Sequence, residues 1–156
     1  MISYQLLDTP LGRMLLAQQE NALIAAEFDA LPRSGWVEAS TPLLVSAGRQ
    51  LTEYFQGRRQ EFSLPLAPQG TPFQQRVWWA LQTIPYGQTR SYGEIARQVN
   101  SPKGARAVGM ANHRNPIAVI VPCHRVVGQN GALTGYAGGL WRKEKLLELE
   151  KGRILY

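Results

Sequence analysis

The sequence predicts an α+β protein: a small N-terminal unit, made of an antiparallel sheet and one helix, packs on a mainly helical C-terminal unit that contains a helix-turn-helix. Three observations support this. Apolar-rich stretches separated by turn residues fill residues 2–28, capped helical patterns follow residue 70, and the net charge changes sign between the two halves. The length of 156 residues allows one ordinary domain or two small units, which excludes a multidomain enzyme.

Composition indicates a globular chain. Hydrophobic residues make up 44% and charged residues 18%, enough apolar material for a packed core. The longest uncharged run, Val126–Trp141, is interrupted by five glycines, so no membrane span is expected. Residues 1–8 lack the features of a signal peptide, and a single cysteine suits a reducing compartment. These observations predict an intracellular, cytoplasmic protein.

The N-terminal unit is predicted as a β-meander followed by a helix. Residues 2–28 contain three apolar-rich stretches with turn residues between them, and 29–40 is expected to be a loop. Thr41-Pro42 then combines an N-cap with proline at the first helical position, and apolar residues keep a helical spacing up to Gly57.

A proline-containing connector at 64–70 marks the predicted boundary between the units, 1–68 and 69–156. Thr71-Pro72 predicts a second capped helix that ends before Pro85. Ser91-Tyr92-Gly93-Glu94 fits a capping box and opens a short third helix.

The third helix is followed by a tight break and by a helix rich in small residues over 103–112, which is typical of a helix-turn-helix. Many helical hairpins that bind no DNA share this pattern. The apolar run 117–121 predicts a buried strand or extended segment that leads into Pro122-Cys123-His124. A final amphipathic helix is expected over 140–150.

Basic residues are concentrated in the C-terminal half. Residues 1–75 hold five basic and seven acidic side chains, whereas residues 76–156 hold twelve and four. Such a surface favours polyanions, and nucleic acid is the commonest of these. Charge alone does not separate this interpretation from a basic surface that only keeps the protein in solution. Glu94 is the only acid in the segment 92–125, whose five basic residues are Arg97, Lys103, Arg106, Arg114 and Arg125.

Cys123 is a candidate nucleophile, because a thiolate needs a nearby cation or base and partial access to solvent. The alternative is a buried, inert cysteine. His124 and Arg125 speak against that alternative, since a buried apolar run rarely continues into two cationic side chains. With one cysteine and two histidines, His113 and His124, no disulfide and no common zinc spacing exists, and no metal is expected.

The local geometry constrains how this cysteine could be activated. In an extended segment neighbouring side chains point to opposite faces, so a direct contact between Cys123 and His124 is awkward and a bridging water is expected. The imidazole also needs an orienting carboxylate. The C-terminal half offers four, which are Glu94, Glu144, Glu148 and Glu150.

Tyr136-Ala137-Gly138-Gly139 is typical of a loop whose backbone amides approach a ligand, although a flexible connection is the simpler interpretation. Together, a thiol, basic helices and an amide-lined loop fit chemistry on a nucleic-acid base taken out of its stack.

These motifs resemble the O6-alkylguanine-DNA alkyltransferases, close to the bacterial Ogt type. The resemblance covers about residues 71–150 and is carried by Pro122-Cys123-His124-Arg125-Val126, with Arg106-Ala107-Val108-Gly109 and Asn115-Pro116 before it and the Tyr136–Gly139 loop after it. It implies a ribonuclease H-like layout for the N-terminal unit. It also implies that Cys123 takes the alkyl group from O6 of guanine as a thioether, in a single turnover without any cofactor.

The resemblance assigns roles to the residues around the nucleophile. His124 acts through water as the base, Glu150 orients His124, and Asn115 braces the turn. Val126, Tyr136, Ala137 and Gly138 read the guanine through main-chain groups, with the Ala137 amide donating to O6, and Lys143 lies near the site.

The same resemblance implies base flipping through the minor groove. Tyr92 pushes on the target phosphate, and Arg106 enters the stack in place of the extruded nucleotide. Small residues allow the helix to approach the groove, and basic residues contact phosphates. The small residues are Ala105, Gly109 and Ala111, and the basic ones include Arg97, Lys103 and Arg114.

The expected partner is double-stranded DNA containing O6-alkylguanine, bound by a monomer, with no membrane and no metal. O4-alkylthymine as a second substrate and cooperative binding stay open. Ala118 stands where some relatives carry proline, which leaves tolerance of bulky alkyl groups open. A lesion-recognition module without transfer is disfavoured by the retention of Cys123, His124 and Glu150, and a cysteine hydrolase by the difficulty of pairing neighbouring Cys and His directly.

Overall fold

The computed structural model describes residues 1–153. Its N-terminal unit is a meander of three antiparallel strands, β1 (Ile2–Thr9), β2 (Gly12–Gln19) and β3 (Ala22–Phe28), as predicted. The strand order is β3-β2-β1-β4, because a two-residue strand β4 (Val37–Glu38) pairs parallel to β1. The prediction of a plain loop over 29–40 was therefore wrong at β4, which is too short and too exposed to leave an alternating pattern.

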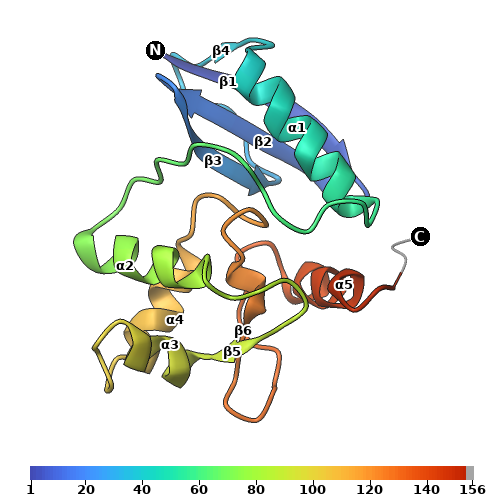
Figure 1. The fold of residues 1–156 in the computed structure, drawn as a ribbon. Helices are drawn as coiled ribbons and strands as arrows, with labels where there is room; N and C mark the ends of the chain where they lie inside the picture. The colour runs from blue at the N-terminus through green and yellow to red at the C-terminus, as the bar shows by residue number, and fades with distance from the viewer. Residues whose placement is uncertain (154–156) are drawn as a thin grey trace.

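Helix α1 (Pro42–Phe55) lies across one face of this sheet (Figure 1). The predicted cap is present: the Thr41 hydroxyl accepts a hydrogen bond from the Leu44 N–H at 3.1 Å. The apolar face of α1 is buried against the strands, and Leu44, Ala47 and Leu51 have no exposed surface.

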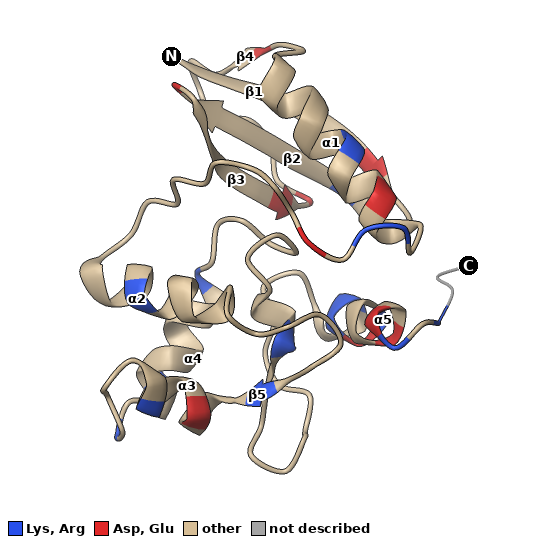
Figure 2. Cartoon of the chain, viewed as in Figure 1, with Lys and Arg blue, Asp and Glu red and all other residues tan. Residues whose placement is uncertain are grey.

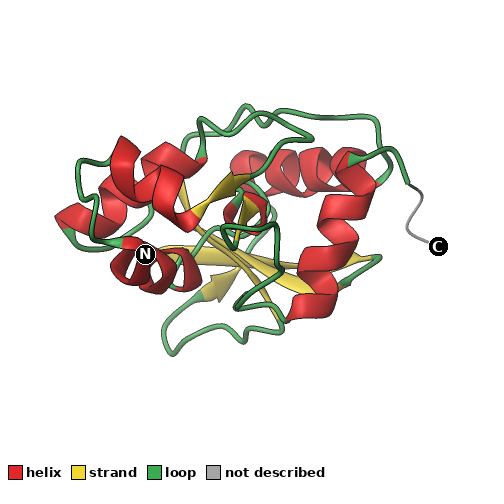
Figure 3. Ribbon diagram, turned by 90° about the horizontal axis from the view of Figure 1, so that it is seen from below, coloured by secondary structure: helices red, strands yellow, loops and turns green. Residues whose placement is uncertain are grey.

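Four helices form most of the C-terminal unit, and all four predicted helices are confirmed. Their bounds are α2 (Pro72–Leu81), α3 (Tyr92–Gln98), α4 (Ala105–His113) and α5 (Leu140–Glu150). Two two-residue strands, β5 (Arg90–Ser91) and β6 (Val126–Val127), pair in parallel. Figure 3 shows from below how the helices lie around the strands of the sheet.

Helices α3 and α4 form the predicted helix-turn-helix and pack on α2. The capping box of α3 is complete, since the Ser91 hydroxyl accepts from the Glu94 N–H while the Glu94 carboxylate accepts from the Ser91 N–H. The Trp78 indole of α2 donates to the Ala111 carbonyl of α4 at 2.8 Å. This bond fixes the second helix of the pair against the core.

The predicted strand over 117–121 is wrong. Only Ile117 forms a bridge, to Ala26 of β3, after which the chain turns and Val119 adopts a φ of +71°. Asn115 supplies the partners that a strand would otherwise need: its Nδ2 donates to the Val121 carbonyl at 2.9 Å and its Oδ1 accepts from the Ile117 N–H at 3.0 Å. A side chain thus satisfies backbone groups of an apolar run that the sequence pattern assigned to a sheet.

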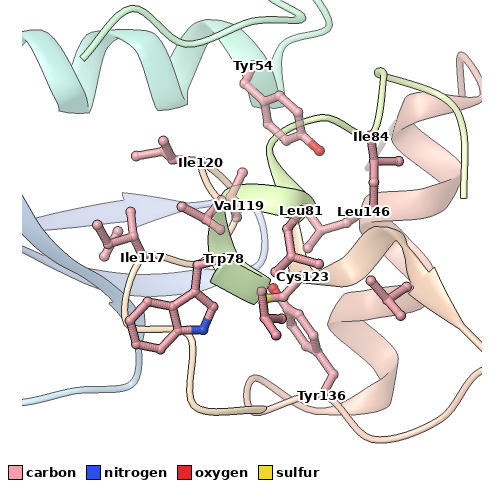
Figure 4. Packing of buried hydrophobic residues seen from close by; sticks show 14 of the residues in the cluster. Tyr54, Trp78, Leu81, Ile84, Ile117, Val119, Ile120, Cys123, Tyr136 and Leu146 are labelled. Atoms are coloured by element: carbon pink, nitrogen blue, oxygen red, sulfur yellow. The ribbon is translucent and has the colours of Figure 1, made fainter. Parts of the chain in front are cut away.

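The two units share one hydrophobic core. Figure 4 shows Tyr54 of α1 pointing into the same buried cluster as Trp78, Leu81, Cys123 and Tyr136 of the C-terminal unit. A side chain from α5 also reaches across: the guanidinium of Arg142 donates to the Leu11 carbonyl at 2.8 Å. Among residues 1–153, no helix combines the length and apolar character that a membrane span requires.

Candidate active site

Cys123 begins a single turn of 3-10 helix, η1 (Cys123–Arg125), and is only 4% exposed. The expectation of an extended segment here was wrong, because the turn that Asn115 holds leads directly into η1. Burial raises the pKa of the thiol, while Asn115, Lys143 and Tyr136 act in the opposite direction. The thiol is therefore protonated at rest and needs a base before it can react.

His124 follows this cysteine in η1 and is completely buried. Its Nε2 lies 2.7 Å from Oε2 of Glu150 in the last turn of α5. Burial alone would raise the pKa of Glu150, but hydrogen bonds and charges of His124 and Arg125 outweigh it and hold that pKa well below its usual range. An ionised carboxylate only accepts, so Nε2 carries the proton and Nδ1 keeps the lone pair.

The pKa of His124 is itself lowered, first by burial and then by Arg125 and Lys143, against the opposing effect of Glu150. The imidazole is thus neutral near pH 7. Its Nδ1 has no hydrogen-bond partner among the described residues. The ring has the tautomer and the free nitrogen that a general base requires.

Arg125 belongs to this network, and sequence reasoning missed it. The guanidinium binds Glu150 through Nε at 2.8 Å and Nη2 at 3.0 Å, and donates from Nη1 to the Ile84 carbonyl at 2.7 Å. The expectation that a buried segment would not continue into His124 and Arg125 was wrong, because both residues are buried: His124 is neutral and Arg125 is neutralised by Glu150. The position directly after His124 was the only signal for this role.

A cavity of about 330 Å³ opens beside the thiol, a size typical of small-molecule sites. The cavity brings together site residues that lie far apart in the sequence. It also includes Arg114, for which the sequence predicted contact with DNA phosphates. Its lining also contains Glu27 and Phe28 from the end of β3, which the sequence pattern did not suggest. The lining residues are Glu27, Phe28, His113, Arg114, Asn115, Ala118, Cys123, Tyr136, Ala137 and Gly138.

The loop on one side of the cavity is held from α5. Arg142 donates to the Gly138 carbonyl at 2.9 Å, and its guanidinium lies 4.5 Å from the centre of the Phe28 ring. A side chain at Gly138 would meet the ring atoms of Tyr136 at 2.9 Å and of Phe28 at 3.3 Å, so this position needs glycine for packing as well. The Ala137 side of the loop is exposed.

Lys143 and Val126 lie outside the cavity lining. The Lys143 ammonium is buried and donates to the Val126 carbonyl at 2.5 Å and to the Thr134 carbonyl at 2.8 Å. Burial lowers the pKa of Lys143 to about 8. Its contacts tie strand β6 to the loop that carries Tyr136, which makes it a support of the cavity wall.

The residues expected to contact DNA lie around the helix-turn-helix. Ala105, Arg106 and Lys103 are exposed at the start of α4, and Gly109 faces the ring of Tyr92, which is half-buried. The Tyr92 hydroxyl accepts from the Thr134 hydroxyl at 3.0 Å. Figure 2 shows basic residues on most elements of the C-terminal unit, with few acidic residues beside them.

No group of three or more His, Cys, Asp or Glu side chains that could hold a metal ion exists within residues 1–153.

Two family models match the chain. The ribonuclease-like domain of 6-O-methylguanine DNA methyltransferase matches residues 2–68, and the DNA binding domain of the same family matches residues 72–152. The methylated-DNA–protein-cysteine methyltransferase of Methanosarcina acetivorans is 52% identical over 153 aligned positions, in an alignment that covers 94% of this chain and 97% of that protein. The constitutive enzyme of that name from Bacillus subtilis is 48% identical over 156 aligned positions, with 95% of this chain and 94% of that protein covered.

A solved structure gives the same result. The crystal structure of Mycobacterium tuberculosis OGT in complex with DNA has a TM-score of 0.91 and 51% identity, covering 97% of this chain and 94% of that one. This similarity confirms the predicted α+β fold class.

Proposed function

The chain belongs to the 6-O-methylguanine DNA methyltransferase family, and from this premise we propose that Cys123 receives the alkyl group of O6-alkylguanine. The activity is direct DNA repair, in which the alkyl group passes from DNA to a cysteine of the protein. One observation carries the assignment to Cys123: the only cysteine of the chain lines a cavity and directly precedes a buried, neutral His124 that is bound to Glu150.

Catalysis begins with the thiol proton. His124 takes this proton through a bridging water on Nδ1, while Glu150 holds the ring in place and stabilises the imidazolium. The Cys123 sulfur then attacks the alkyl carbon, so that an S–C bond forms as the C–O6 bond breaks. The electron pair stays on O6, and guanine takes up one proton, which balances the proton lost by the thiol.

The protein is consumed in this reaction. A thioether has no easy leaving group, and no second cysteine is present to resolve it. Each molecule therefore repairs one base.

Access to the base depends on the helix-turn-helix. Arg106 enters the stack in place of the extruded guanine, and Tyr92 pushes on the target phosphate. Small side chains at Ala105 and Gly109 let α4 approach the minor groove, while Lys103 and Arg114 bind phosphates. The exposure of Arg106 and Lys103 at the start of α4 supports these roles.

The flipped guanine is read by the walls of the cavity. The Ala137 amide donates to O6, and main-chain groups of Tyr136 and Gly138 contact the remaining edges within the cavity. The main chain of Val126, outside the cavity lining, completes the reading of the base. The bond from Lys143 to the Val126 carbonyl supports this wall. Asn115 braces the turn that presents Cys123, in keeping with its bonds to Ile117 and Val121.

We also propose an oligomeric state, a DNA form and a cellular compartment for the reaction. The units 1–68 and 69–156 act as one monomer on double-stranded DNA in the cytoplasm. The sole cysteine suits a reducing compartment, where a free thiol persists.

Intact-protein mass spectrometry tests the transfer directly. The protein is mixed with a duplex that carries O6-methylguanine, and the adduct is located by peptide mapping. We expect a stoichiometric gain of one methylene unit on Cys123 and no gain in Cys123→Ser, which should still bind the duplex. Tight binding by the unaltered chain without a mass change would refute the proposal and indicate a recognition module.

A further inference from the structure

The N-terminal unit reaches the carboxylate of the active site. Tyr54, in the last turn of α1, donates from its hydroxyl to Oε2 of Glu150 at 2.6 Å, across 96 residues of sequence. The same Oε2 accepts from Nε2 of His124 at 2.7 Å. Tyr54 has no exposed surface, and Figure 4 shows its hydroxyl pointing away from α1 into the core of the C-terminal unit.

We propose that Tyr54 is a positioning residue for alkyl transfer, acting through Glu150 on the protonation and orientation of His124. This inference rests on the proposed function, and it gives the N-terminal unit a part in the chemistry beyond packing.

Tyr54 can act only as a donor at this position. Burial raises the pKa of its phenol well above the usual value of 10, and the charge of Glu150 raises it further. The hydroxyl therefore stays protonated throughout the range in which the protein functions. When the Glu150 carboxylate accepts this hydrogen bond, the oxygen attracts its other hydrogen-bond donors less strongly.

Glu150 distributes its charge over several donors. Besides Tyr54 and His124, it receives the Arg125 guanidinium on both oxygens and the Gly87 N–H on Oε1 at 3.3 Å. Each donor weakens the pull of the carboxylate on the imidazole proton. Tyr54 and Nη2 of Arg125 both donate to the Oε2 that holds Nε2 of His124, and the Tyr54 contact is the shortest of the three.

This competition helps to keep His124 neutral and therefore able to accept the thiol proton. The groups that act on the imidazole are Glu150 and Lys143 of α5 and Arg125 of η1, in addition to burial. Glu150 is the one among them that favours the imidazolium. Removing the Tyr54 hydroxyl leaves Glu150 more basic, strengthens its attraction for the charged imidazole and raises the pKa of His124.

The surroundings of Tyr54 make a clean substitution available. Three aromatic rings, those of Phe55, Phe62 and Tyr86, lie with centres 5.4, 5.6 and 6.2 Å from its own. Tyr54→Phe keeps these contacts and removes only the oxygen. Tyr86→Phe is the matched control, because the Tyr86 hydroxyl lies 3.5 Å from the Leu149 carbonyl and donates to no carboxylate of residues 1–153.

Nitrogen-15 NMR of histidine-labelled protein measures the protonation of His124 directly, and Tyr86→Phe controls for the loss of a hydroxyl from the same aromatic cluster. The chain has two histidines, exposed His113 and buried His124, so the signals are assigned with one His113→Gln variant. We expect the His124 midpoint to rise by about half a pH unit or more in Tyr54→Phe, because hydrogen bonds to charged groups are among the stronger ones. The midpoint should be unchanged in Tyr86→Phe.

Single-turnover transfer from an O6-methylguanine duplex gives the second measurement. A midpoint that rises by about half a pH unit lowers the fraction of neutral imidazole about threefold below that midpoint, so Tyr54→Phe should react about threefold more slowly at acidic pH and change little at neutral pH. The acid limb of its pH–rate profile should move upward together with the NMR midpoint.

The results separate this inference from the function on which it depends. An unchanged His124 midpoint in Tyr54→Phe, an equal shift in Tyr86→Phe, or a slower rate without any shift would overturn the positioning role. Absence of transfer by the unaltered chain would overturn the proposed function instead, and the NMR comparison would still report whether Tyr54 tunes His124.

Discussion

Replacing Glu150 with glutamine removes the charge that Arg125 and His124 share. Arg125 is 6% exposed and its guanidinium binds both carboxylate oxygens, so the substitution leaves a buried cation without its counter-charge. Breaking a buried ion pair in this way costs about 3–5 kcal/mol of unfolding free energy. For a chain of this size, that corresponds to a fall in Tm of roughly 10 °C.

Urea denaturation measures this cost, and an exposed ion pair supplies the control. Asp8 and Arg13 pair at 3.0 Å, but their side chains are 82% and 61% exposed, so Asp8→Asn should change stability little. Adding Arg125→Met to Glu150→Gln should recover part of the loss, because the unpaired cation is then gone. Equal stability of Glu150→Gln and Asp8→Asn would refute the view that this network stabilises the fold.

The contribution of Glu150 to the free energy of unfolding should depend on pH in a definite direction. The pKa of Glu150 is lower in the folded chain than in the unfolded one, so the ionised carboxylate stabilises the fold at neutral pH. This contribution declines as the pH falls below about 4.3, the ordinary value of a glutamic acid, where the unfolded chain binds a proton that the folded chain does not. The difference in stability between the unaltered chain and Glu150→Gln should therefore narrow under acid conditions.

Three further outcomes follow from the structure. Arg106→Ala should slow repair of duplex DNA far more than reaction with a free O6-alkylguanine base in single-turnover assays, and equal slowing would contradict the insertion of Arg106 into the base stack. Affinity for duplex DNA should fall with salt, with a slope that decreases by about one in Lys103→Gln; a flat salt response would argue against phosphate contacts. Asn115→Ala leaves the Ile117 N–H without a partner and removes one of two hydrogen bonds to the Val121 carbonyl, which still accepts from the Cys123 N–H at 2.8 Å, so urea denaturation should show a loss of about 1–3 kcal/mol.

Local signals in the sequence were sufficient for most of the fold. The caps at Thr41 and Thr71 and the capping box at Ser91 place three helix starts, because each is made by residues within three positions of one another. The strand predicted over 117–121 was wrong because its conformation does not depend on local signals alone. The pattern registers apolar residues, but the conformation is decided by the Asn115 side chain and by the single bridge to Ala26.

The site residues also differ in whether the local sequence reveals them. Cys123, His124 and the loop at Tyr136 stand out in sequence because their residue types are unusual in their context. Tyr54 and the cavity residue Phe28 give no such signal, since each is an apolar residue in an amphipathic element and gains its role from contacts far away in the chain. Arg125 was misjudged because its charge predicts exposure, and only the fold reveals the carboxylate that neutralises it.

The contacts between the units indicate why an N-terminal unit without the nucleophile is needed at all. Phe28 at the end of β3 supplies part of the cavity wall, and Arg142 joins the β1–β2 turn at Leu11 to the Gly138 carbonyl of the cavity loop. Tyr54 from α1 meets Glu150 on the other side of the nucleophile. A C-terminal unit alone would therefore lose one cavity wall and one hydrogen bond to its carboxylate, while a buried base depends on both exclusion of water and correct hydrogen bonding. In the proposed reaction, packing of the sheet unit is in this sense a condition for the reactivity of Cys123.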